Sequence, residues 1–323
     1  MRGFHAMGML DSRILQVASP FDRKTLAAFE STCEVVQFNS LPNRRDLVRL
    51  AEFMERHPAV ALRAYGGYDG SLDDLEFLEF FPRLTRFHAD ALRYRGFTGI
   101  EGLRFLPDTV VDLRLGQTGR KFSLLPIKRF ASLERLYLEG PWKDMEVISS
   151  FSLLNDLTLR SVTLPDLSLL VPLRHLRSLD LKLGGTKDLS LLPELASLRY
   201  LELWMIRGLD DIEPVAELES LQHLFLQDLA RVDRLPDMRR MSSLRRVHIQ
   251  NLKSLTDLTP LLDAPALEEL EVYQCRQLTP EHFECLVGHP TLTHIAVGLG
   301  SLKKNEAVGK MLPLPRPKRF VFR

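Results

Sequence analysis

The 323-residue sequence has few cysteines, no excess of charge of one sign and no long hydrophobic run. Its three cysteines are too few and too unevenly spaced for a disulfide framework, so nothing requires an oxidising compartment. Lys and Arg total 43 against 42 Asp and Glu, and this balance argues against a general nucleic-acid binder. No window approaches the roughly 18 uncharged apolar residues of a membrane span, and the first ten residues lack the apolar stretch of a signal peptide. We therefore expect a soluble, cytoplasmic protein that does not enter a membrane.

The common catalytic and nucleotide-binding motifs are also missing. The sequence contains no G-x-x-x-x-G-K-[ST] loop, no G-x-G-x-x-G, no H-E-x-x-H and no G-x-S-x-G. These absences favour a protein that is not an enzyme and that uses no cofactor. Arginine clearly outnumbers lysine and leucine is abundant, which is typical of a GC-rich, bacterial coding genome.

A repeat fills most of the chain. An aliphatic residue is followed by another at +3 and a third at +5, and successive starts lie about 23 residues apart. Such a period is typical of solenoids, in which each turn contacts only its neighbours. The starts of these repeats are Leu84, Val110, Leu133, Leu154, Leu176, Leu198, Leu221, Leu244, Leu267 and Leu292.

The spacing within a repeat predicts its local structure. The +2 step from Leu201 to Leu203 indicates a short strand, because alternate side chains of a strand point to the same side. The next apolar residues, such as Ile206, Leu209 and Ile212, follow in +3 steps, which fit neither an α-helix nor a strand. They suit 3₁₀-like turns, where residues i and i+3 fall on one side. We therefore expect a thin outer side that is not fully helical.

This pattern resembles the leucine-rich repeat family, in the short-repeat form of internalin-like and other bacterial members. The resemblance implies an α/β solenoid, a horseshoe with a parallel β-sheet on its concave face. Family members often carry Asn or Cys eight residues after the first leucine, to bond the backbone of adjoining turns. Here that position holds Val162, Ile206, Leu229 and Leu252, and only Cys275 matches. We therefore expect the turns to be held mainly by apolar stacking, with a cysteine-type repeat near the C-terminus.

The two ends of the chain are less regular than its middle. We interpret residues 1–323 as one solenoid, with helix-backed turns and a cap over 1–83, regular repeats over 84–291, and C-terminal turns and a cap over 292–323. Terminal turns are usually atypical because they shield the apolar core from water. The pattern predicts strands at 14–18, 34–38 and 60–64, helices at 22–31, 43–56 and 303–312, and a last strand through Phe320 and Phe322.

The residues between the strand leucines should face the concave side. From Tyr200 to Tyr273 these positions are rich in aromatic residues, His and Arg, which are favoured in the centres of protein interfaces. On adjacent strands we expect them to form a contiguous apolar patch that binds another protein, unless they serve only as cross-strand pairs that stabilise the sheet. The predicted partner-binding residues are Tyr137, Tyr200, Glu202, Trp204, His223, Phe225, Arg246, His248, Glu271 and Tyr273.

Several other functions are compatible with parts of the sequence. A toxin-neutralising, immunity-type protein would suit a chain of repeats without a catalytic domain. A catalytic or metal-dependent protein could use the C-terminal histidines, because His282, Cys285 and His289 would share one helical face. However, Cys275 matches an inward-pointing position, so we expect ordinary repeat residues and no metal. Nucleic-acid binding through Arg-rich segments such as 239–246 is disfavoured by the balanced net charge.

Overall fold

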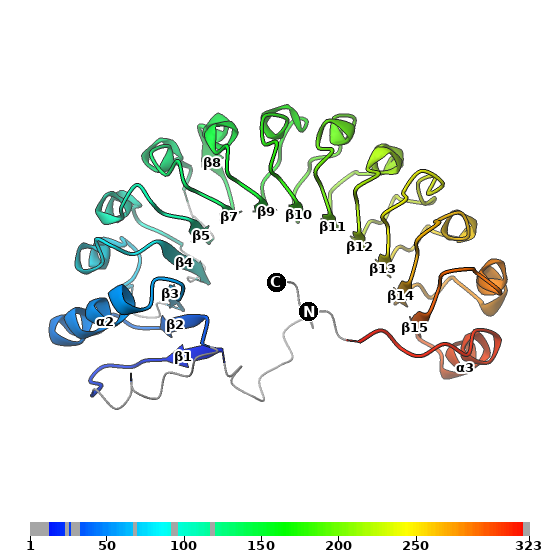
Figure 1. The fold of residues 1–323 in the computed structure, drawn as a ribbon, viewed down its shortest axis with the longest axis horizontal. Helices are drawn as coiled ribbons and strands as arrows, with labels where there is room; N and C mark the ends of the chain where they lie inside the picture. The colour runs from blue at the N-terminus through cyan, green and yellow to red at the C-terminus, as the bar shows by residue number, and fades with distance from the viewer. Residues whose placement is uncertain are drawn as a thin grey trace. The chain divides into compact units, whose positions relative to one another are not determined.

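The computed structural model describes residues 13–22, 26, 33–66, 70–91, 96–116 and 120–318. The chain divides into two compact units, Met1–Leu154 (unit 1) and Asn155–Arg323 (unit 2). In each unit, parallel strands lie side by side along the inner side of the ribbon and short turns lie along its outer side (Figure 1). The interpretation of residues 1–323 as one continuous solenoid stays a prediction.

Unit 1 contains a parallel sheet with the strand order β1-β2-β3-β4-β5-β7 and a small second sheet formed by β6 and β8. The helix α2 connects β2 to β3, and later connections are 3₁₀ helices (labelled η). The elements are β1 (Ile14–Gln16), β2 (Val35–Phe38), α2 (Arg44–Arg56), β3 (Ala61–Tyr65), η1 (Glu76–Phe80), β4 (Arg86–Ala91), η2 (Glu101–Phe105), β5 (Asp112–Leu115), β6 (Phe122–Ser123), η3 (Leu125–Ile127), β7 (Arg135–Glu139), β8 (Trp142–Lys143) and η4 (Met145–Ser150).

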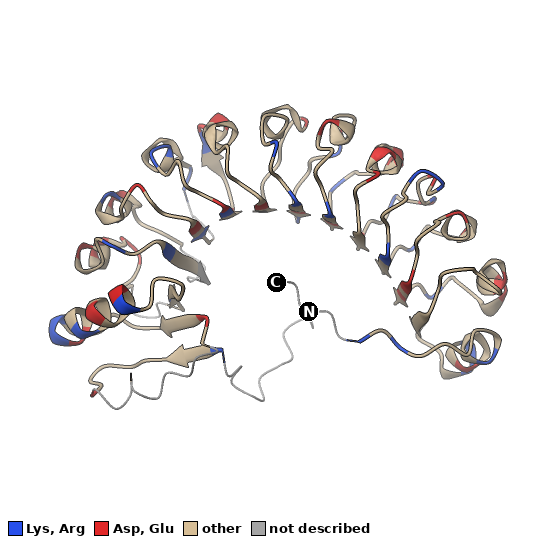
Figure 2. Ribbon diagram, viewed as in Figure 1, with Lys and Arg blue, Asp and Glu red and all other residues tan. Residues whose placement is uncertain are grey.

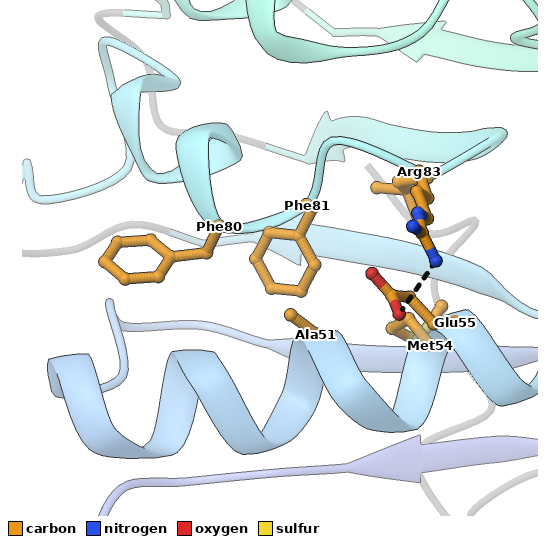
Figure 3. Close-up of a pocket in the computed structure, with 7 residues that line it drawn as sticks. Ala51, Met54, Glu55, Phe80, Phe81 and Arg83 are labelled. Carbon is orange, nitrogen blue, oxygen red and sulfur yellow. Dashed lines mark ion pairs between the residues drawn. The ribbon is translucent and has the colours of Figure 1, made fainter.

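Helix α2 confirms the prediction of a helix over 43–56. The Asn43 side chain caps it by accepting a hydrogen bond from the Asp46 backbone N–H. Figure 3 shows the helix beside the η1 turn, with Phe81 above Ala51. The residues that line the crevice between them leave about 10 Å³, at the lower limit of the room that one water molecule needs. This crevice is therefore a packing contact and not a ligand site.

Unit 2 contains the parallel strands β9 to β15 in sequence order. The connections between them are thin, as the sequence predicts, and the one between β12 and β13 has no helix in residues 228–245, all of which are described. The elements are β9 (Asp156–Arg160), η5 (Ser168–Leu170), β10 (Ser178–Lys182), η6 (Leu192–Glu194), β11 (Tyr200–Trp204), η7 (Glu213–Glu217), β12 (His223–Gln227), β13 (Arg246–Gln250), η8 (Thr259–Leu261), β14 (Glu269–Tyr273), η9 (Pro280–Leu286), β15 (His294–Gly298) and α3 (Leu302–Met311).

The repeated aliphatic residues form the core of each turn. In the repeat that begins at Leu198, every apolar position of the pattern is at most 5% exposed. The position where the family often has Asn or Cys is buried and apolar in most repeats of unit 2, as at Ile206 and Leu229. Apolar stacking of neighbouring turns therefore holds this core, as expected. The buried set of this repeat is Leu198, Leu201, Leu203, Ile206, Leu209, Ile212, Val215 and Leu218.

A left-handed residue follows each of the strands β9 to β14. All six residues have φ between 51° and 58°, although none is glycine. The backbone N–H of each donates to a carbonyl in the following repeat, for example from Met205 to Gln227 at 2.8 Å. The ladder of strand hydrogen bonds is thus extended by one residue before the chain turns into the core. The six residues are Ser161, Leu183, Met205, Asp228, Asn251 and Gln274.

The turns also approach each other closely at Gly184. A Cβ atom at this position would lie 2.1 Å from the backbone oxygen of Val162 in the preceding repeat. Only glycine fits there without moving the backbone. Next to it, the buried Thr186 hydroxyl accepts a hydrogen bond from the Leu164 N–H at 2.9 Å.

The predicted C-terminal helix is confirmed as α3, which the Ser301 side chain caps by accepting from the Lys304 N–H. The predicted helix at 22–31, apart from Asp22 and Leu26, lies outside the described residues, and so do Phe320 and Phe322. In the part of the chain that the structure describes, no helix has both the length and the hydrophobicity needed to cross a bilayer.

Candidate functional site

Strand alternation decides which side chains of unit 2 reach the surface. Along β9, β10, β12, β13 and β14 every second residue is partly exposed, and the residues between them are buried. The parallel register aligns these positions in rows across the strands, and we call the three rows the concave face of unit 2. The first row is Asp156, Ser178, Tyr200, His223, Arg246, Glu269 and His294; the second is Thr158, Asp180, Glu202, Phe225, His248, Glu271 and Ala296; the third is Arg160, Lys182, Trp204, Gln227, Gln250, Tyr273 and Gly298.

Three rings on neighbouring strands are in contact on this face. Phe225 stacks on His248, with ring centroids 4.1 Å apart and ring planes 13° apart. The Tyr273 ring lies 5.5 Å from the His248 ring. The Glu271 carboxylate accepts a hydrogen bond from the Tyr273 hydroxyl at 3.1 Å, and its other oxygen lies 3.1 Å from His248 Nδ1. One carboxylate thus fixes the orientation of two of the three rings.

The remaining aromatic residues of the face are fixed in a similar way. The Tyr200 hydroxyl donates to Glu202 Oε2 at 2.9 Å, and its ring meets the edge of His223. The Trp204 indole Nε1 donates to Asp228 Oδ2 at 3.0 Å. The guanidinium of Arg160 lies 5.3 Å from the Trp204 ring centroid, within cation–π distance.

A lysine joins two carboxylates in the middle of the face. Lys182 Nζ lies 2.9 Å from Asp180 Oδ2 and 2.8 Å from Glu202 Oε2. Burial and the nearby Glu202 charge raise the pKa of Asp180 to about 6, although Lys182 opposes this. Thr158 also donates to Asp180 Oδ2, at 3.2 Å. The face therefore holds an acidic group whose ionised form is destabilised at neutral pH.

The charges of the concave face are mixed. Arg246 forms an ion pair with Glu269, and both side chains are mostly buried. Burial and the Arg246 charge lower the pKa of His223 to about 4, so this ring is neutral at pH 7. The hydrogen bond from His248 holds the pKa of Glu271 below its usual value, so Glu271 is ionised. Figure 2 shows acidic and basic residues on these strands, without a run of either sign.

Nine of the ten predicted binding residues lie on the concave face of unit 2, and the tenth is Tyr137. That residue lies on β7 of unit 1, where its hydroxyl donates to Glu139 Oε2 at 2.8 Å. The expected contiguous apolar patch stays a prediction: the rings of Phe225, His248 and Tyr273 are in contact, but Trp204 lies in another row than Phe225. Within the third row, Trp204 lies between the polar residues Lys182 and Gln227. The face therefore combines a group of contacting rings with an aromatic residue whose row neighbours carry charged and amide groups.

Asp228 and Asn251 were not among the predicted site residues, and they lie directly after strands β12 and β13. The Asp228 carboxylate accepts from Trp204 Nε1 and from Gln227 Nε2, and it also bonds the Asn251 amide. Both residues have the left-handed conformation that Asp and Asn tolerate better than other non-glycine residues. Their presence at the same position of consecutive repeats is the signal that could have identified them.

Unit 1 carries a second polar group, centred on Asp112 of β5. The Asp112 side chain is 3% exposed, and Arg135 Nε lies 3.0 Å from its Oδ2 atom. His88 Nε2 lies 3.2 Å from Oδ1, while Arg114 Nε is at 3.7 Å and Arg86 at 4.0 Å. Burial would raise the pKa of Asp112, but the His88 hydrogen bond and the arginine charges outweigh it and lower this pKa to about 2. We call these five residues the Asp112 cluster.

The C-terminal residues considered as metal ligands are used within the repeat. Cys275 is fully buried, and the His282 ring caps η9 by accepting from the Thr279 N–H at 3.1 Å. His289 is buried, with Nε2 3.1 Å from the Leu261 carbonyl and Nδ1 accepting from the Leu292 N–H. Within the described ranges, no group of three His, Cys, Asp or Glu residues is placed to hold a metal ion.

Comparison with known proteins agrees with this architecture. No protein-family model and no curated protein sequence matches the chain. Among solved structures, an internalin from Listeria monocytogenes aligns with 80% of this chain and 81% of its own, at 20% identity and a TM-score of 0.50. A leucine-rich repeat protein from Leptospira interrogans aligns with 94% of this chain and 74% of its own, at 18% identity and a TM-score of 0.57. The predicted leucine-rich repeat fold is therefore confirmed.

Proposed function

We propose that the chain is a non-enzymatic protein-interaction module that binds a protein partner through the concave face of unit 2. The observation that carries this proposal is the set of contacts that fixes partly exposed Trp, Tyr and Arg side chains on this face. Tyr200, Trp204 and Tyr273 each donate to a carboxylate, and Arg246 is paired with Glu269. These residue types dominate the centres of protein interfaces.

Fixed side chains favour binding because their ordering has already taken place on folding. Immobilising a flexible side chain at an interface costs about 0.5–1.5 kcal/mol. The stacked rings of Phe225 and His248 and the bonded Trp204 avoid most of this cost. The charged groups beside the aromatic residues also favour a partner with complementary polar groups over nonspecific hydrophobic contact.

The titratable groups of the face support a binding role more than a catalytic one. Both ring nitrogens of His248 lie within hydrogen-bond distance of neighbours, Glu271 and Gln250. Lys182 is engaged by Asp180 and Glu202 together. These groups neutralise each other, whereas a catalytic site directs its groups toward a shared space for the substrate.

The proposal can be tested by adding bulk to the face at a partly exposed position. Gln250 is partly exposed on β13, so Gln250→Arg projects a longer side chain from the face. Thr256→Arg makes a matched change at an exposed loop position of the same repeat. Proteins captured from lysate of the source cells are quantified by mass spectrometry for the wild type and both variants, after their melting temperatures are shown to agree.

We expect the same specific proteins to be captured by the wild type and by Thr256→Arg, and to be lost with Gln250→Arg. Equal capture by all three proteins would contradict binding at this face. A second variant, Trp204→Ala, removes a side chain of the type that is favoured in the centres of protein interfaces. It should reduce the amount of the same captured proteins.

A further inference from the structure

The Asp112 cluster of unit 1 contains more positive than negative charge. Arg86, Arg114 and Arg135 surround one carboxylate, and the low pKa of Asp112 keeps that carboxylate ionised. The three arginines therefore leave an excess of two positive charges at neutral pH, whatever the charge of His88. Adjacent strands lie about 4.8 Å apart, so β4, β5 and β7 gather these charges within about 10 Å.

Much of the hydrogen-bonding capacity of these arginines is unused. Arg114 and Arg135 approach Asp112 through Nε, and their side chains are 42% and 40% exposed. Among the described residues, the terminal nitrogens of both have no hydrogen bond or ion pair. The Nε atom of Arg86 is buried and also has no hydrogen-bond partner in that part of the chain. A guanidinium presents its donors as a planar fork that matches a carboxylate.

We infer that the Asp112 cluster binds carboxylate groups of an acidic segment on the protein partner. This inference rests on the proposed function, because it takes the partner to be a protein. Its support is charge complementarity: partly exposed guanidinium groups with unused donors attract carboxylates, and the buried Asp112 holds them in place. A nucleic acid fits less well, because a phosphate backbone is bound by basic residues that extend along a protein surface. The whole chain has a net charge of only +1.

The test uses the full chain and a fluorescein-labelled hexaglutamate peptide as the probe. Binding is followed by fluorescence anisotropy at about 50 mM salt and again at about 300 mM, where screening is stronger. Hexalysine and a six-nucleotide deoxythymidine oligomer serve as comparison probes. The variants are the double substitution Arg114→Gln/Arg135→Gln, the charge-conserving Arg114→Lys/Arg135→Lys, and a matched control outside the sheet face, Arg83→Gln/Arg104→Gln.

We expect the wild type to bind hexaglutamate more tightly than either comparison probe, with affinity falling at the higher salt. The Gln double variant should bind at least about fivefold more weakly, since each exposed charge pair contributes up to about 1 kcal/mol. The control should bind as the wild type does, and the Lys variant should retain most of the affinity. Equal peptide binding by all variants, or tighter binding of the oligonucleotide, would overturn the inference. Neither result bears on capture through unit 2, so failure of this inference can be told apart from failure of the proposed function.

Discussion

Replacing Asp180 by Asn should stabilise the protein at neutral pH, although Asp180 lies in an ion pair. The Asp180 pKa is about 6, above the 3.8 of an unperturbed aspartate, because burial and Glu202 disfavour its charge. A group with a raised pKa in the folded state binds its proton more tightly there than in the unfolded state. Its stabilising contribution is fully present below pH 3.8 and is lost as the pH rises through about 6.

The expected size follows from the two pKa values. The interval from 3.8 to about 6, at roughly 1.4 kcal/mol per pH unit, corresponds to about 3 kcal/mol of stability lost by pH 7. Asn resembles the protonated acid, and its amide oxygen can still accept from Thr158 and Lys182, while Lys182 keeps its pair with Glu202. We therefore expect Asp180→Asn to raise the free energy of unfolding at pH 7 by about 1–3 kcal/mol.

Urea unfolding of the wild type and the variant between pH 4 and pH 8 measures this difference. The gain should be largest at pH 7–8 and should vanish near pH 4, where Asp180 is protonated in the wild type. His223, whose lowered pKa has the opposite effect over this interval, is common to both proteins and cancels. The exposed Asp210→Asn serves as control and should show no such gain. A variant less stable than the wild type at pH 7, or a gain independent of pH, would refute the reasoning.

Three further substitutions test how neighbouring turns are joined. Thr186→Val leaves the buried Leu164 N–H without its acceptor and should lower the free energy of unfolding by about 1–3 kcal/mol. Thr186→Ser keeps the hydroxyl and should not lower it. Equal losses of stability in urea unfolding of the two variants would argue against this hydrogen bond. Asn tolerates the left-handed backbone of Met205 better than Met does, so Met205→Asn should raise the free energy of unfolding by about 1 kcal/mol. A lower melting temperature of this variant would argue against backbone strain at Met205. Gly184→Ala brings a Cβ onto the Val162 carbonyl and should cost more than about 3 kcal/mol, so a near-native melt would show that the turns can separate.

The repeat unit could be predicted from the sequence because its cause is local and periodic. Alternation at Leu201 and Leu203 identifies a strand, and the +3 steps through Ile206 and Leu209 identify turns too tight for an α-helix. Every repeat presents the same pattern, so ambiguity at one position is resolved by the others. The helix over 43–56 was predicted in the same way, from apolar residues that share one helical face, and it is α2 in the structure.

The character of the concave face could not be predicted in the same way. The sequence identified which residues face outward, but not which of them contact each other across strands. The register places Trp204 between Lys182 and Gln227, whereas the rings of Phe225, His248 and Tyr273 contact each other. Asp228 was missed because it follows the strand, where only the left-handed backbone turns it toward Trp204. The pKa of Asp180 depends on burial, which the spacing of residues does not give.

Site-specific photo-crosslinking tests the central claim most directly. The photoreactive residue p-benzoylphenylalanine replaces either Gln227, on the concave face of unit 2, or Arg234, whose side chain is 82% exposed in the turn after β12. If the concave face binds the partner, irradiation in the source cells should give a discrete protein adduct from position 227 and none from position 234. An adduct from position 234 alone, or equal adducts from both, would contradict the account.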